Sequence, residues 1–283
     1  MQYFEAKPSP LLAGFIKCFW SLCSEAGSGA AEPILPDGCP EIVFNLSDRF
    51  RRLHSDGSYE TQPVTIVSGQ LRSSISIMST GSVDLFGVRF HPAGAFPFLR
   101  MPLSEITDRV EALDSIIGRD GKLIEQKTAN ANSFEDRVRA FEGQCLESLD
   151  RFPVEDDRAQ RLSLEISGRK GQISISGLCD FSGIGGRKLE RIFKRYIGLS
   201  PKTFARVVRF QNVVRRIEAA NSMSMLDTAL DLGYYDQSHM IREFREFAGK
   251  SPLAYFDETH RLSELFTSDH MSDSYNTSGR SER

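Results

Sequence analysis

The chain has 283 residues with a formal net charge of −3, and 26% of them are charged. That length allows two domains, each with its own core. No apolar run approaches a membrane span, no signal peptide is evident, and the five Cys residues lack C-x-x-C spacing. We therefore expect a cytoplasmic protein with reduced thiols and no membrane partner.

The N-terminal residues have the pattern of an antiparallel β unit. Four strand-like runs, separated by Gly, Pro, Asp and Ser, are 41–46, 64–67, 74–78 and 83–90. Pro36-Asp37-Gly38 predicts a turn, because Pro fixes φ and Gly supplies a positive φ. Trp20, the only tryptophan, is expected to fill the core. We predict a β-rich sensor or dimerisation domain over residues 1–112.

A helical connector is predicted over residues 113–157. Helices are expected after Ser104 and after Ser133, each with Ser as the N-cap and an acidic residue in the following turn. The polar stretch 119–132 between them is predicted to be a loop.

The last hundred residues contain one unit twice, offset by 51 positions. Each copy has the pattern of a short helix, a turn with Gly183 or Gly233, and a second helix with opposed apolar and basic faces. Such a pair of helices is typical of a helix-turn-helix. Glu243 stands where the first copy has Ile192, so the second apolar stripe is predicted to be narrower.

Charge is segregated along the chain. Residues 158–257 hold 17 Lys and Arg against 10 Asp and Glu, whereas the rest holds 18 against 28. A charged face on one amphipathic helix is usually just solvated surface. Here the pattern occurs twice in register within a basic segment, which favours contact with DNA phosphates.

Ser200-Pro201 is predicted to begin a long helix between the two copies, ending near Ala220. About 20 residues at 1.5 Å each span about 30 Å. Successive major-groove faces lie roughly 34 Å apart. The spacing therefore predicts that one chain places two recognition helices in adjacent grooves.

Specific motifs in residues 158–257 resemble the AraC/XylS family of bacterial transcription regulators. They are residues 185–193, 198–202, 206–211, 229–239, 244 and 249–252. The resemblance implies an all-α domain of two helix-turn-helix units joined by a linker helix. It also implies action at promoter DNA, usually as an activator that contacts RNA polymerase. The tail, residues 258–283, is expected to be disordered.

The family's base-reading positions fall on the outer faces of the two second helices. Arg187 and Arg191 suit guanine, Glu190 suits cytosine and Gln237 suits adenine. Lys194, Lys202 and Arg245 are expected to contact phosphate. Three further candidates for DNA contact are Ser238, His239 and Arg242.

The N-terminal half resembles, more loosely, the β-barrel sensor domain that precedes some AraC-type domains, through residues 35–45 and 87–94. The whole chain is thus expected to be an α+β two-domain protein with an N-terminal antiparallel, cupin-like barrel. This resemblance implies effector sensing or homodimerisation. Arg89 is a candidate to bind an anionic effector if it points into the barrel; the alternative is an outward, solvated Arg89.

Catalysis has little support in the sequence. The five His residues form no His-x-His pair, and no phosphate-binding loop or nucleophile motif is present. We expect no metal and no cofactor. Three hypotheses remain: an effector-responsive regulator, a DNA-binding protein whose N-terminal domain only dimerises or binds a protein partner, and, least favoured, an enzyme that uses the β domain.

Overall fold

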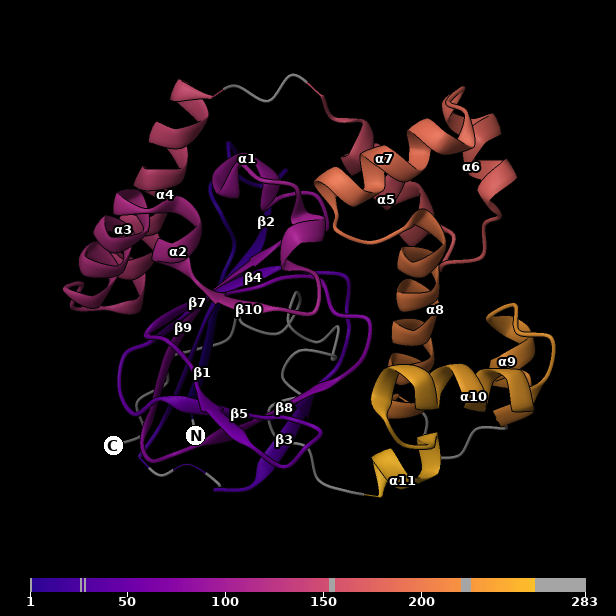
Figure 1. The fold of residues 1–283 in the computed structure, drawn as a ribbon, viewed down its shortest axis with the longest axis horizontal. Helices are drawn as coiled ribbons and strands as arrows, with labels where there is room; N and C mark the ends of the chain where they lie inside the picture. The colour runs from indigo at the N-terminus through magenta and orange to yellow at the C-terminus, as the bar shows by residue number, and fades with distance from the viewer. Residues whose placement is uncertain (1, 26, 28, 153–155, 220–224, 258–283) are drawn as a thin grey trace, which may run out of the picture.

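The computed structural model describes residues 2–25, 27, 29–152, 156–219 and 225–257. An N-terminal β unit with its own helices lies beside a C-terminal unit made of helices (Figure 1). This is the predicted α+β architecture. The tail expected to be disordered lies outside the described residues.

The strands form two antiparallel sheets, with the orders β1-β2-β9-β4-β7-β10 and β3-β8-β5-β6. The four predicted runs are confirmed as β4, β7, β8 and β9. In chain order the strands are β1 (Gln2–Ala6), β2 (Ile16–Ser24), β3 (Ala31–Ile34), β4 (Glu41–Asn45), β5 (Phe50–Leu53), β6 (Tyr59–Thr61), β7 (Thr65–Ser68), β8 (Ile75–Ser79), β9 (Val83–Phe90) and β10 (Val110–Ala112).

Alternation along the strands divides the β unit into two cores, because successive side chains point to opposite faces of a sheet. Trp20 belongs to the core between the sheets, together with Phe50 of the smaller sheet. Phe19 and Phe44 belong to the other core and meet Phe141 of a covering helix at ring distances of 6.1 and 6.2 Å. Trp20 therefore fills core, as predicted.

The helices of the N-terminal unit are α1 (Phe96–Leu99), the 3-10 helix η1 (Leu103–Ile106), α2 (Leu113–Ile117), α3 (Arg119–Ala129) and α4 (Phe134–Arg151). The Ser133 cap is confirmed, since its hydroxyl accepts from the Asp136 amide at 3.1 Å. The prediction of a helix after Ser104 is wrong. Ser104 lies inside the four-residue η1, which ends before β10.

The loop predicted over residues 119–132 is also wrong, because most of it is α3. Few apolar residues mark this helix, and its stability comes from packing on α2 and α4. Gly121 allows the approach to α2: a Cβ there would lie 2.9 Å from the Leu113 carbonyl oxygen.

The C-terminal unit contains both helix-turn-helix units in the predicted order. Its helices are α5 (Arg158–Gly168), α6 (Ile175–Ser182), α7 (Gly186–Tyr196), α8 (Pro201–Glu218), α9 (Met225–Asp231), α10 (Gln237–Ala248) and α11 (Pro252–Phe256). Gly183 ends α6 in the left-handed region at φ 66°, which permits the tight turn into α7.

The linker helix α8 lies between the two helix-turn-helix units of the C-terminal unit, with α7 near one end and α10 near the other (Figure 1). The Ser200 hydroxyl accepts from the Thr203 amide at 3.0 Å, and Pro201 occupies the first helical position. Its 18 residues are about 27 Å long. The capped start predicted at Ser200-Pro201 is therefore confirmed.

Glu243 is buried, at 3% exposure, and joins α10 to α8. Its carboxylate accepts hydrogen bonds from Arg209 at 2.8 Å, from Arg206 at 2.7 Å and from the Tyr234 hydroxyl at 2.9 Å. The narrower apolar stripe predicted for the second copy thus corresponds to a buried ionic contact. This contact fixes the second helix-turn-helix on the linker helix.

We predict that Glu243→Gln lowers the free energy of unfolding by about 3 kcal/mol, because Arg209 then stays half-buried without its counter-charge. Burial opposes ionisation, but hydrogen bonds from Arg209 and Arg206 lower the pKa of Glu243 below its ordinary 4.5. The contribution is therefore complete above about pH 4.5 and falls as the pH drops through the lowered pKa. Urea unfolding across this range measures both effects.

The matched control is Glu246→Gln, which changes a mostly exposed carboxylate on the same helix that also pairs with Arg206. This substitution should lower the free energy of unfolding by only about 0–1 kcal/mol. Equal losses in the two variants would contradict the role assigned to Glu243.

Candidate nucleic-acid interface

The two faces of α7 differ as the sequence predicted. Leu189, Ile192 and Phe193 are buried in the core of the C-terminal unit. Arg187, Arg191 and Lys194 are exposed, and Glu190 is half-buried. These four side chains border one open groove, to which Pro102 and Ser104 of the N-terminal unit also belong.

In α10, Met240, Phe244 and Phe247 are buried, whereas Ser238, Arg242 and Arg245 are exposed. Gln237 and His239 are half-buried in the first turn. The Asp236 carboxylate caps the helix by accepting from the His239 amide at 2.7 Å. The His239 ring meets Tyr234 edge-on at 5.4 Å, which fixes it at the start of the helix.

Most arginines of the C-terminal unit fall into two groups. One group, on the supporting helices, is used in internal ion pairs: Arg158, Arg161, Arg169, Arg206, Arg209 and Arg216. By contrast, the cations predicted to contact DNA make no ion pair with any residue that the structure describes: Arg187, Arg191, Lys194, Lys202, Arg242 and Arg245. Unpaired charge is therefore concentrated on α7, on α10 and at the start of α8.

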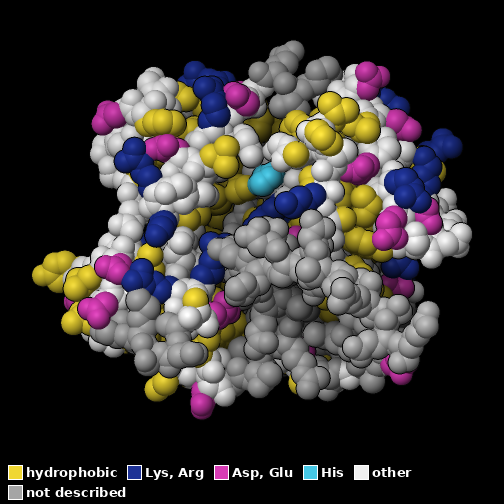
Figure 2. All heavy atoms as spheres, turned by 180° about the vertical axis from the view of Figure 1, so that it is seen from behind, with side chains coloured by type: hydrophobic (Ala, Val, Ile, Leu, Met, Phe, Trp, Pro, Cys, Tyr) yellow, Lys and Arg dark blue, Asp and Glu magenta, His cyan; other side chains and the backbone are white. Residues whose placement is uncertain are grey.

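Figure 2 shows the molecule from behind the view of Figure 1. Where its atoms are described on this face, basic, acidic and apolar side chains are interspersed (Figure 2).

Comparisons with known proteins agree with this arrangement. Residues 178–258 match the family described as "Helix-turn-helix domain". This part of the chain is thus similar to an AraC-type helix-turn-helix domain. Residues 4–112 match the family described as "Domain of unknown function (DUF6597)". The predicted resemblance to the AraC/XylS family is thus confirmed.

An uncharacterized HTH-type transcriptional regulator of Haemophilus influenzae is 27% identical over 105 residues. The match covers 37% of this chain and about a third (35%) of that protein's length. Crystal structures of ToxT from Vibrio cholerae are similar over 84% of this chain and 97–98% of theirs, at 10–11% identity and TM-scores of 0.46 and 0.48.

The two units meet in more than one place. One of these contacts, the interdomain junction, is formed by Leu35, Pro36 and Gly38 of the loop before β4 and by Phe204 and Gln211 of α8. Leu35 is buried in the core of the C-terminal unit. The Gln211 side-chain amide donates to the Pro36 carbonyl at 2.7 Å. Gly38, at φ +82°, lies so close to the Phe204 ring that a Cβ would be 3.0 Å away.

Arg89 supports this loop from the β unit. It is buried, at 4% exposure, and pairs with Asp37 of the loop and with Glu41 of β4, the latter at 2.9 Å. The alternative prediction of an outward, solvated Arg89 is therefore wrong. Because two carboxylates already surround the guanidinium, an anionic ligand would have to displace one of them. Its predicted role in effector binding remains untested.

The β unit holds a mostly apolar cavity of about 70 Å³ between its two sheets. Trp20, Glu41, Asn45 and Gln62 are among its lining residues. The sequence analysis missed Asn45 and Gln62 as candidates. A signal was present, because Glu41, Val43 and Asn45 alternate onto one face of β4, and polar residues flank Val43.

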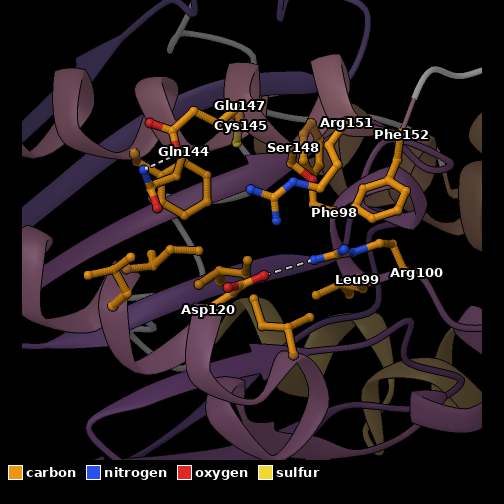
Figure 3. Close-up of a pocket in the computed structure, with 15 residues that line it drawn as sticks. Phe98, Leu99, Arg100, Asp120, Gln144, Cys145, Glu147, Ser148, Arg151 and Phe152 are labelled. Atoms are coloured by element: carbon orange, nitrogen blue, oxygen red, sulfur yellow. Dashed lines mark hydrogen bonds and ion pairs between the residues drawn. The ribbon is translucent and has the colours of Figure 1, made fainter.

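A second cavity, of about 120 Å³, lies between α1, α3 and α4. Its floor is the core around Phe141 and Leu99. Arg100 at its rim pairs with Asp120 at 3.2 Å and lies over the Phe152 ring, and Arg151 points into the space from α4 (Figure 3). Part of this wall comes from α3, which the sequence analysis had assigned to a loop.

No group of three or more His, Cys, Asp or Glu side chains within the described ranges is placed to hold a metal ion. Likewise, no described helix is both long and apolar enough to cross a bilayer.

We predict that Gln211→Leu weakens the interdomain junction. It leaves the buried Pro36 carbonyl without a donor, which costs about 1–3 kcal/mol. Urea unfolding measures this loss, and hydrogen exchange should show faster exchange of the amides of residues 37–39.

Asn212→Leu is the matched control, because the Asn212 amide donates only to the Val208 carbonyl of its own helix. Exchange in residues 37–39 should not change in this variant. If both variants accelerated it equally, the Gln211 contact would not be what holds the loop.

Proposed function

We propose that the protein is a sequence-specific transcription regulator that inserts α7 and α10 into successive major grooves of promoter DNA. The observation that carries the proposal is the unpaired charge on these two helices, while the supporting arginines are neutralised internally. Leaving cations unpaired on one surface has no benefit for stability, but it suits neutralisation of phosphates.

The spacing supports the same proposal. The linker helix is about 27 Å long, and each recognition helix adds part of its own width at either end. The total is compatible with the roughly 34 Å between groove faces. The expected site is asymmetric, covers about two helical turns and needs no palindrome.

Within this proposal, Arg187, Glu190, Arg191, Gln237 and Arg242 read bases. Ser238 and His239 contact bases or phosphate. Lys194, Lys202 and Arg245 contact phosphate and set the register. Contact with RNA polymerase follows only from the family resemblance.

For the β unit we propose effector binding in preference to a purely dimerising role. The observation that favours it is the mostly apolar cavity between the sheets, since small-molecule sites are concave and apolar with a few polar groups.

The test of DNA reading begins with selection of binding sites from random duplexes by the full chain. On the selected site, Arg191→Ala should weaken the free energy of DNA binding by about 1–3 kcal/mol and relax the base preference at one position of the site. Fluorescence anisotropy with specific and random duplexes measures both. An equal loss on the two duplexes would contradict base reading by Arg191.

Lys202→Ala should instead weaken binding to all sequences alike and reduce the slope of log affinity against log salt by about 1. Arg216→Ala is the matched control, because Arg216 pairs with Asp231 at 2.5 Å within the protein. It should leave the salt slope unchanged, and a slope equal to that of Lys202→Ala would argue against the assigned division of charge.

A further inference from the structure

One polar side chain of the cavity between the sheets has an unused hydrogen-bonding atom. Asn45 is buried, at 4% exposure. Its amide nitrogen donates to the Pro63 carbonyl at 3.4 Å, and its carbonyl oxygen Oδ1 has no partner. Since a backbone carbonyl can only accept, this contact fixes the orientation of the amide. Oδ1 is left as a free acceptor.

An unpaired buried acceptor costs about 1–3 kcal/mol and needs an explanation. Replacing Asn45 by an apolar residue would remove this cost. A donor supplied by a bound molecule would remove it too, and the position of Asn45 in the cavity lining makes such a donor accessible.

The rest of the cavity defines the body of that molecule. Isoleucine, valine, leucine and phenylalanine side chains from both sheets dominate the lining, with Trp20 among them. No Lys, Arg or His belongs to the described lining, and the one carboxylate, that of Glu41, already pairs with Arg89. The surface thus suits an apolar body and offers no positively charged side chain to an anion.

The size limits the molecule further. The cavity has about 70 Å³, whereas one of roughly 150 Å³ holds benzene. About three or four non-hydrogen atoms fit without rearrangement of the walls.

We propose that this cavity binds a small apolar molecule that carries one hydroxyl or amine donor, which Asn45 Oδ1 accepts. The inference rests on the proposed effector role of the β unit and names the chemical class of the effector. It assigns Asn45 as the residue that selects a donor over an acceptor of the same shape.

The test uses probes of one shape: 2-propanol, isopropylammonium, acetone and acetate. Trp20 lines the cavity and is the only tryptophan, so its indole N–H resonance reports occupancy in the full chain. We expect 2-propanol to shift this resonance with an affinity about ten-fold higher than that of acetone, which has no donor. Acetate should produce no saturable shift.

The ammonium arm separates the two donors. Tighter binding of isopropylammonium than of 2-propanol would identify the donor group of the bound molecule as an amine. The reverse order would identify it as a hydroxyl, and either result supports the proposal. Equal affinities of 2-propanol and acetone, or no saturable shift with either donor, would overturn it.

Asn45→Leu should abolish the preference for 2-propanol over acetone, whereas Gln144→Leu, an amide on α4 outside this cavity, should retain it. If Asn45→Leu fails to fold, the comparison of probes on the unaltered chain still decides. DNA selection without any probe tests the proposed regulator separately, so the two results can fail independently.

Discussion

The loop before β4 is anchored in both units, and it joins them together with the Thr107–Gly198 and Ser74–Phe247 hydrogen bonds and the Phe96–Tyr196 ring contact. On one side, Leu35 is buried in the core of the C-terminal unit and the Pro36 carbonyl accepts from Gln211. On the other side, Asp37 pairs with the buried Arg89 of the β unit. Because an unpaired buried charge or carbonyl is costly, neither side can be released without loss of stability. A loop of a few residues therefore couples the β unit to the linker helix.

Pairing of charges within the protein also explains how the helices of the C-terminal unit are held together. Arg206 and Arg209 would add to its positive surface, but Glu243 and Glu246 neutralise them and thereby fix α10 on α8. Cations at the supporting positions stabilise the fold, and those on α7 and α10 remain available to a polyanion. Net charge along the sequence counts both groups equally, so it overstates the charge that DNA would meet.

Local periodicity accounts for what the sequence predicted. The α7 and α10 faces, the Ser133 and Ser200 caps and the four predicted strand runs each depend on residues close together in the chain. The failures depend on distant partners. Helix α3 has a polar sequence and relies on neighbouring helices. Arg89 is buried beside two carboxylates about fifty residues earlier, Asp37 of the loop before β4 and Glu41 of β4 itself. No local pattern contains either contact.

Glu41 connects the cavity to the interdomain junction. It lines the space between the sheets and also pairs with Arg89, which in turn pairs with Asp37 of the anchored loop. A molecule in the cavity would therefore lie against a carboxylate whose position is tied, through one guanidinium, to the loop that contacts α8. Since α8 sets the separation of the two recognition helices, the cavity and the proposed DNA-binding surface share one continuous chain of packed and ion-paired groups. Coupling along it requires only that occupancy change the balance of the Glu41–Arg89 and Asp37–Arg89 pairs.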